Sequence, residues 1–274
     1  MAVTFVVSTN SAEILQDNFL ASPCFGKSHP HEILVQKGFR SAAASYNDAI
    51  RRGLNDVIVF AHQDMVFPSA WLSDLDRAIM ILEKDDPNWG VLGCYGMTMG
   101  NQGKGYVYTH GLGILGAPFE HPAPVQTLDE IVLILRKSSG LKFDERLPHF
   151  HFYGADICLT AAKRGMKSYA ISAFCAHNSQ LNYVLPAEFY DCYKVLKRIW
   201  KDALPIQTTC IRVTPFDFQM RVRQLKAPYL KYMRHKAIGA RRAQGGLRLL
   251  EQIEKAAPNS IADGTNLQPI RTKP

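Results

Sequence analysis

The sequence predicts an α/β protein in which a mostly parallel sheet is flanked by helices. Short apolar runs typical of buried strands alternate with longer stretches of helical periodicity. Polar residues directly follow several of these runs, as they do at the carboxyl ends of strands in open α/β sheets. The chain has 274 residues, of which 47% are apolar, so it can form a large core without disulfides.

The first predicted strand covers residues 4–7 and leads into a polar loop, Ser8, Thr9 and Asn10, suited to hydrogen-bonding a base or ribose. A helix at residues 41–53 and a second strand at 57–60 complete a β-α-β unit. Its parallel strands should place residues 8–10 and 62–64 along one edge of the sheet. The elements expected further on are a helix at 71–82, strands at 89–93 and 131–135, a helix at 154–164 and a strand at 168–174. Eight glycines between residues 93 and 116 indicate irregular backbone, a close approach to a ligand or a mobile loop.

The second strand ends in Ala61-His62-Gln63-Asp64. Strand alternation points His62 and Asp64 to one side, with Gln63 between them. Two such side chains can share a divalent cation, and a cation there can hold a diphosphate. The alternative is that Asp64 simply begins the turn before Pro68.

Candidate catalytic residues lie in the second half of the chain. Asp156 stands at the start of the helix predicted from residue 154, where a carboxylate can act as a general base or simply cap the helix. His177 follows the strand at 168–174 and is either a structural histidine or a further ligand of the cation. The pair Asp129 and Glu130 either forms an ordinary strand entry or holds substrate hydroxyls.

His151 and Tyr153 stand just before that helix and either shape an acceptor pocket or pack in the core. His149 and His151 form a His-x-His pair that in isolation could also bind a metal. Their position favours an acceptor loop.

Several motifs occur in the order shown by a known family. They are Tyr46-Asn47-Asp48-Ala49-Ile50, residues 56–64, Phe67-Pro68-x-x-Trp71-Leu72, Leu128-Asp129-Glu130, Phe143-Asp144-Glu145, residues 150–156 and Ala176-His177-Asn178-Ser179. Over residues 3–200 the chain resembles GT-A fold glycosyltransferases. In particular it resembles the bacterial glycosyltransferase-like group related to a streptomycin-biosynthesis protein. One departure is that the usual Asp-x-Asp metal motif reads His62-Gln63-Asp64 here.

The resemblance implies a GT-A, Rossmann-like fold and transfer of a sugar from a nucleoside-diphosphate sugar to an acceptor hydroxyl, with inversion at the anomeric carbon. The residues expected to meet the donor are Ser8, Thr9, Asn10, Asn47, His62, Gln63 and Asp64. A divalent cation, Mn²⁺ or Mg²⁺, is expected on Asp64, His62 and His177. Asp156 matches the place of the family's general base, and Asp129, Glu130, His151 and Tyr153 are expected at the acceptor.

Six cysteines are scattered without a Cys-x-x-Cys pair, which suits a reducing cytosol and argues against a zinc ribbon. No signal peptide and no apolar segment of the roughly 20 residues needed to span a bilayer is recognised. The sequence therefore predicts a cytoplasmic protein that can attach peripherally to the inner face of the cell membrane.

Charge is concentrated at the carboxyl end. From Lys194 onward the chain holds 17 Lys and Arg against 5 Asp and Glu, whereas the preceding residues hold 15 against 19. Residues 1–200 are predicted to form the GT-A domain, 201–256 a basic helical extension and 257–274 a flexible tail. Three roles stay open for the basic face. It is solvated, or it binds an anionic membrane or a saccharide or lipid-linked acceptor. The role least expected is binding to nucleic acid.

Two rival functions remain open on sequence alone. A non-catalytic module that binds a nucleotide sugar is favoured by the missing first carboxylate of the metal motif. A sugar-phosphate nucleotidyltransferase would share the sheet, but its Gly-rich, Arg-containing loop is absent from residues 8–20.

Overall fold

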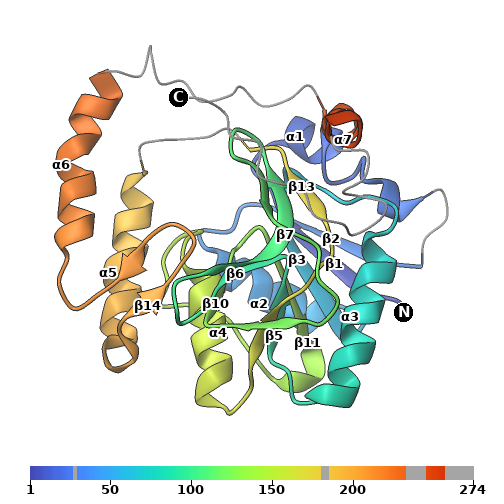
Figure 1. The fold of residues 1–274 in the computed structure, drawn as a ribbon, viewed down its shortest axis with the longest axis horizontal. Coiled ribbons are helices and arrows are strands. Elements are labelled where there is room, and N and C mark those ends of the chain that lie inside the picture. The colour runs from blue at the N-terminus through green and yellow to red at the C-terminus, as the bar shows by residue number, and fades with distance from the viewer. Residues whose placement is uncertain (27–29, 180–184, 233–244, 257–274) are drawn as a thin grey trace.

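The computed structural model describes residues 1–26, 30–179, 185–232 and 245–256, and every structural statement concerns these residues (Figure 1). The predicted tail at 257–274 lies outside them.

The centre of the molecule is a seven-stranded sheet with five parallel strands. Strands β11 and β9 run antiparallel to their neighbours. The predicted α/β class, with a mostly parallel sheet flanked by helices, is confirmed. In spatial order the strands are β2 (Glu32–Gln36), β1 (Thr4–Ser8), β3 (Val57–His62), β11 (Val132–Arg136), β5 (Val91–Gly93), β12 (Ser168–Ala170) and β9 (Ala123–Val125).

The predicted parallel pairing at the start of the chain is also confirmed. Strands β1 and β3 are parallel neighbours, and Ser8 lies opposite His62 in their register. The polar loop after β1 and the His-Gln-Asp motif therefore meet at one sheet edge. The sequence prediction missed the short helix α1 (Ala12–Asp17), the 3-10 turn η1 (Pro23–Phe25) and strand β2, which lie between them.

Alternating side chains of the central strands pack into two cores, one on each face of the sheet. Val6, Ile58 and Phe60 join the core beneath α2 (Ala42–Arg52) and α4 (Tyr153–Lys163). Phe5 and Val59 join the opposite core beneath α3 (Trp71–Asp85). Both faces are thus covered, as the continuous apolar runs of these strands require.

A second sheet forms from the segment that sequence analysis marked as glycine-rich. Its strands are β10 (Thr127–Leu128), β6 (Tyr95–Met97), β7 (Gly103–Thr109), β13 (Cys175–His177) and β4 (Met65–Val66), with β8 (Gly113–Gly116) beside β7. Gly116, at φ 78°, packs so tightly on Gly105 that a side chain there would overlap its carbonyl oxygen. The pairing of β13 with β4 sets His177 opposite Met65, the neighbour of Asp64.

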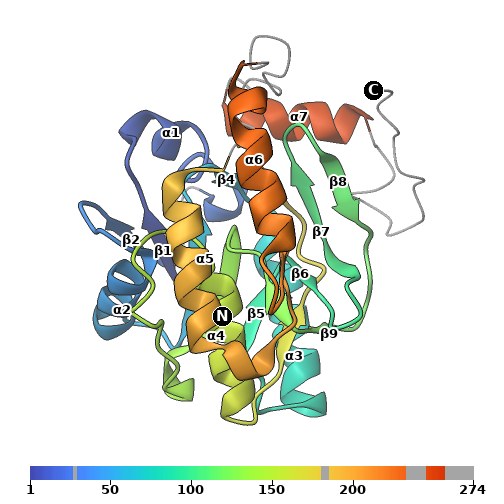
Figure 2. The same cartoon turned by 90° about the vertical axis from the view of Figure 1, so that its left-hand side faces the viewer.

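The carboxyl-terminal elements pack on this framework. Helix α5 (Ala187–Ile199) and a hairpin bury Phe189, Leu196 and Ile206 in the core shared with α2 and α4. Helix α6 (Phe218–Tyr232) lies beside α5, as the two views in Figures 1 and 2 agree. Helix α7 (Gly246–Ala256) covers the second sheet. The remaining elements are η2 (Lys137–Ser139), η3 (Lys201–Ala203), β14 (Ile206–Gln207) and β15 (Arg212–Val213).

None of the helices in the described ranges is both long enough and apolar enough to cross a membrane.

Candidate metal centre and its surroundings

Three potential metal ligands converge where β3 and β13 end. One ligand atom from each of His62, Asp64 and His177 lies within 4.8 Å of the others. Nε2 of His177 is 3.3 Å from Oδ1 of Asp64, and the two imidazole rings are 5.6 Å apart between centroids. Imidazole nitrogens and a carboxylate suit zinc, iron and manganese better than calcium. The structure thus brings together the three residues that the sequence predicts as metal ligands.

The environment of His62 favours its neutral form. Burial, followed by the nearby His177, lowers the pKa of His62 to about 4. Asp64 and Asp129 act in the opposite direction but do not outweigh burial. Neutral imidazole is the form that binds metals, so His62 is ready to act as a ligand at neutral pH.

Tyr153 fixes the orientation of the His62 ring. The Tyr153 hydroxyl donates to the carbonyl oxygen of Glu130 at 3.0 Å and lies 2.9 Å from Nε2 of His62. Since the hydroxyl proton is used by Glu130, Nε2 of His62 carries the proton and donates to the Tyr153 oxygen. Nδ1 is then left as the electron-pair donor, and Tyr153 acts as the outer partner that metal-binding histidines usually have.

Gln63 organises the loop after β1 rather than pointing to the cation. Its Oε1 accepts hydrogen bonds from the Thr9 hydroxyl and from the backbone amides of Asn10 and Ser11. Its Nε2 donates to Oδ1 of Asn10 at 2.7 Å. The Ser8 hydroxyl pairs with that of Ser45 at 2.6 Å. The predicted nucleotide loop therefore lies beside the metal ligands and is already held in one conformation.

Asn47 lies apart from that loop. Its amide donates to the Phe143 carbonyl at 2.9 Å and accepts from the Phe143 amide at 2.9 Å. It also donates to Glu145 at 3.0 Å. These bonds hold the segment before α4 against α2, and the contact of Asn47 with the nucleotide stays a prediction.

The residues expected at the acceptor surround the cluster. Asp129 accepts the Ile131 amide at 3.1 Å, and its charge raises the pKa of His62. The Glu130 carboxylate lies at the first turn of α4, where Oε1 is 3.4 Å from the Gly154 amide. The His151 ring stacks edge-on against Phe189 of α5, and burial lowers its pKa. Tyr153 is buried beneath the cluster, so it supports His62 rather than presenting an open surface.

Asp156 is not exposed toward this site. It is fully buried, and its Oδ1 accepts a 2.7 Å hydrogen bond from the Trp200 indole. Burial raises the pKa of Asp156 to about 6, while Trp200 opposes that shift. The hydrogen bond with Trp200 joins α4 to the end of α5. The role of Asp156 as general base stays a prediction.

Sequence reasoning missed the groups that support the ligands from behind. The Asn178 amide donates to the Asp64 carbonyl at 2.9 Å, and its side chain donates to Oδ1 of Asn18 at 2.7 Å. Asn18 and Asn178 are both buried and 160 residues apart. A single sequence carries no signal for such a pair beyond the nearness of Asn178 to His177.

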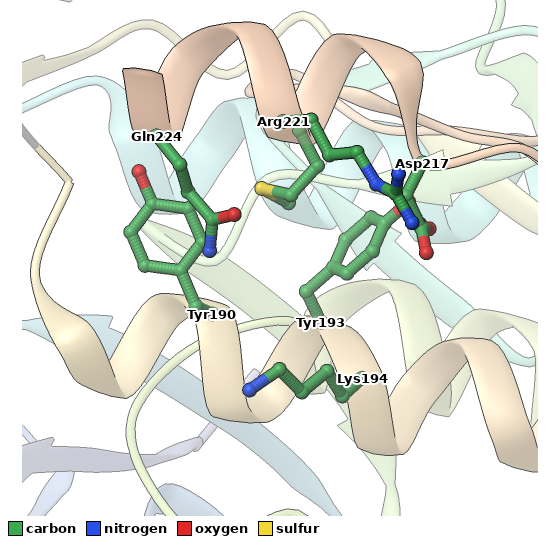
Figure 3. A pocket seen from close by; sticks show the side chains of 7 residues that line it. Tyr190, Tyr193, Lys194, Asp217, Arg221 and Gln224 are labelled. Carbon is green, nitrogen blue, oxygen red and sulfur yellow. The ribbon is translucent and has the colours of Figure 1, made fainter. Parts of the chain in front are cut away.

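A separate groove lies between α5 and α6 (Figure 3). Phenol rings from α5 and an arginine and a glutamine from α6 face one another across it. Its floor is fixed by Asp217, which accepts hydrogen bonds from Tyr193 at 3.1 Å and Lys197 at 2.5 Å. The lining residues are Tyr190, Tyr193, Lys194, Asp217, Met220, Arg221 and Gln224. None of them belongs to the metal cluster.

No protein-family model matches the chain. A curated relative, described as "ATP synthase subunits region ORF 6" of Fuscovulum blasticum, is 31% identical over 125 residues. These residues are 44% of this chain and 50% of the relative, so the chain spans about half the length of the curated relative it matches.

Solved structures show remote similarity. TarS of S. aureus with UDP-GlcNAc is 12% identical at a TM-score of 0.44, with 75% of this chain and 67% of that chain covered. The mannosyltransferase PcManGT of Pyrobaculum calidifontis with GDP-Man and Mn²⁺ is 12% identical at a TM-score of 0.44, with coverages of 96% and 76%. A197 from STIV is 15% identical at a TM-score of 0.39, with coverages of 63% and 83%.

Proposed function

We propose that this protein is a glycosyltransferase that moves a sugar from a nucleoside-diphosphate sugar to an acceptor hydroxyl. The observation that carries the proposal is the convergence of His62, Asp64 and His177 within 4.8 Å, beside the preformed loop at Ser8–Asn10. In open α/β sheets, this edge is where ligands bind. Two of the motifs that resemble GT-A glycosyltransferases, residues 56–64 and Ala176-His177-Asn178-Ser179, meet at this edge.

The three ligands fit a divalent cation, Mn²⁺ or Mg²⁺, which would neutralise charge on the leaving diphosphate. His62 stands in place of the acidic residue of the usual metal motif, and His177 adds a second imidazole. The two histidines favour Mn²⁺, because imidazole is a poor ligand for Mg²⁺. Gln63 keeps the loop after β1 in place, and Ser8, Thr9 and Asn10 provide hydroxyl and amide groups for the base and ribose. The acceptor is expected on the side of Asp129, Glu130 and His151.

A donor panel with the full chain tests this proposal. Purified protein is incubated with UDP-, GDP-, dTDP- and ADP-sugars and Mn²⁺, and released nucleotide is measured with and without a chelator. Asp64→Asn and His177→Ala are expected to lower both Mn²⁺ affinity, measured by calorimetry, and nucleotide release by at least tenfold. His121→Ala, which alters an exposed histidine away from the cluster, is the matched control.

The products separate the rival functions. Release of nucleoside diphosphate supports glycosyl transfer. Formation of pyrophosphate from a nucleoside triphosphate and a sugar phosphate would instead identify a nucleotidyltransferase. Tight binding of a nucleotide sugar without turnover, across acceptors that include simple saccharides and lipid-linked sugars, would identify a binding module.

We further propose that α6 holds the protein at an anionic membrane surface, where a lipid-linked or polymeric acceptor would be presented. Phe218, Leu225 and Tyr229 recur at helical spacing on one face of α6 and are between 64% and 79% exposed. Arg221 and Lys226 flank this apolar stripe, and α6 contains no acidic residue. A second copy of α6 would bring like charges together, whereas anionic lipid complements them.

Vesicle co-sedimentation tests the role of α6. The protein should bind vesicles containing phosphatidylserine, ignore phosphatidylcholine vesicles, and dissociate as salt rises past physiological strength. Leu225→Ser and the pair Arg221→Glu, Lys226→Glu should each abolish binding. Met80→Ser on α3 and Lys84→Glu are matched exposed controls. Failure to bind anionic vesicles at low salt would refute the membrane role.

The further basic residues Arg234, Lys236, Arg241 and Arg242, which the sequence also suggests for charge reversal, lie outside the described residues.

A further inference from the structure

We propose that Glu130 is the catalytic base that takes the proton from the acceptor hydroxyl. This inference rests on the proposed glycosyl transfer and names the residue that performs one of its steps. Glu130 lies on the connection between β10 and β11, and its carboxylate reaches the first turn of α4.

The start of α4 is shaped to receive this carboxylate. Oε1 of Glu130 is 3.4 Å from the amide nitrogen of Gly154. A Cβ atom at position 154 would lie 3.0 Å from Cγ of Glu130 and 2.7 Å from the Leu128 carbonyl oxygen. Only glycine leaves enough room here for the Glu130 carboxylate, which reaches the helix start from a neighbouring connection.

The backbone leading into α4 is also unusual. Phe152 has φ 64°, a left-handed conformation that is costly for a residue other than glycine. The backbone amides of residues 152–154 favour the charged form of Glu130. An unfavourable turn that presents amides to a single carboxylate is typical of a functional site.

Glu130 is joined to the metal centre through one side chain. Its carbonyl oxygen accepts the Tyr153 hydroxyl at 3.0 Å, and that hydroxyl lies 2.9 Å from Nε2 of His62. The residue is half-buried, whereas Asp156 is fully buried and bonded to Trp200. Glu130 is therefore the more exposed residue of the two.

The step balances without another reactant. A Glu130 carboxylate oxygen takes the hydroxyl proton while the acceptor oxygen forms a bond to the anomeric carbon. The bond from that carbon to the diphosphate oxygen breaks, and its electron pair leaves with the nucleoside diphosphate. Burial, followed by the charge of Asp129, raises the pKa of Glu130 to about 8, which suits a base that works in mildly alkaline solution.

The test compares Glu130→Gln with Asp156→Asn and the exposed control Glu120→Gln in the full chain. Glu130→Gln is expected to lower kcat by about 100-fold or more. It should also remove the fall in rate that the wild type shows as pH drops below about 8, where Glu130 becomes protonated. The Kd for Mn²⁺ and nucleotide and the Tm should stay near wild type. Gly154→Ala should lower kcat in the same direction by displacing Glu130.

Wild-type turnover and an unchanged pH profile in Glu130→Gln would overturn the assignment, while the proposed function would stand. Loss of turnover in a folded Asp156→Asn that still binds donor would overturn it in favour of Asp156. If the wild type releases no nucleoside diphosphate from any donor, the proposed function fails and this inference fails with it.

Discussion

The indole nitrogen of Trp200 donates a 2.7 Å hydrogen bond to Oδ1 of Asp156, and so ties the residue that follows α5 to the first turn of α4. Asp156 is one of few fully buried carboxylates among the described residues, and its second oxygen has no hydrogen-bond partner there. Such a group is costly to keep charged in the interior. The buried Asp156 carboxylate therefore affects the stability of the fold, and the size of this effect depends on pH.

Replacing Asp156 with Asn should change how stability depends on pH. The folded-state pKa of about 6 lies above the ordinary value of 3.8, so the folded chain holds this proton more tightly than the unfolded chain. The associated stability is fully present below pH 3.8 and is lost as pH rises through 6. Asn does not titrate, so between pH 4 and pH 7 the variant should gain up to about 3 kcal/mol relative to wild type.

Urea unfolding of both proteins at pH 4, 5, 6 and 7 measures this difference. Asp202→Asn, which alters an exposed carboxylate, is the control and should follow wild type. A constant difference between Asp156→Asn and wild type at all four values would contradict the burial of a titrating group.

Asn47→Ala should destabilise the fold while leaving the nucleotide site intact. The change removes both hydrogen bonds with Phe143 and leaves a buried amide and carbonyl unpaired. Each unpaired buried group costs about 1–3 kcal/mol, so a fall in unfolding free energy of about 2–4 kcal/mol is expected. At 10 °C, where the variant is folded, its Kd for the nucleoside diphosphate should match wild type. A raised Kd in the folded variant would support the contact between Asn47 and the nucleotide that the sequence predicts.

Gln63→Ala should weaken donor binding without removing the cation site. Without Oε1, the amides of Asn10 and Ser11 and the hydroxyl of Thr9 lose their shared acceptor. Ordering the loop must then occur on binding, which should raise the donor Kd by about tenfold, equivalent to 1.4 kcal/mol. Calorimetry with nucleoside diphosphate and with Mn²⁺ alone separates the two effects. An equal loss of Mn²⁺ affinity would mean that Gln63 supports the cation directly.

The parts of the molecule that could be predicted from the sequence are those governed by local pattern. The apolar run at Val57–Phe60 and the polar residues after it were enough to place His62 and Asp64 at a sheet edge. His177 is the last residue of β13, a strand that ends at the same place and is separate from β12, which covers the start of the strand predicted at 168–174. The direction of a strand in the sheet could not be predicted from the pattern of apolar residues. The run at residues 131–135 reads as a central strand, yet β11 is antiparallel to both neighbours.

Side-chain roles could not be predicted where distant contacts decide them. The sequence motif puts Asp156 at a helix start, but only the fold shows that Trp200, 44 residues away, covers it. The proximity of Gly154 and Glu130 is likewise set by the packing of α4 on the connection between β10 and β11. The role of Asn47 also depends on a distant contact, because its partner Phe143 is 96 residues away.

Helix α7 packs on two short strands, β4 and β13, that lie beside or carry the candidate metal ligands. Leu249 is buried in a small core with Val66 of β4, two residues after Asp64, and Ala176 of β13, next to His177. Leu249→Ala should lower the unfolding free energy by about 2–5 kcal/mol, as is usual for truncation of a buried leucine. Because α7 covers the strands that position two ligands, Mn²⁺ affinity should fall as well. Glu251→Ala changes an exposed residue of the same helix and should alter stability by less than about 0.5 kcal/mol. Denaturant unfolding and Mn²⁺ calorimetry on the wild type and the two variants measure both effects. Wild-type Mn²⁺ affinity in a clearly destabilised Leu249→Ala would show that the ligands are held without α7.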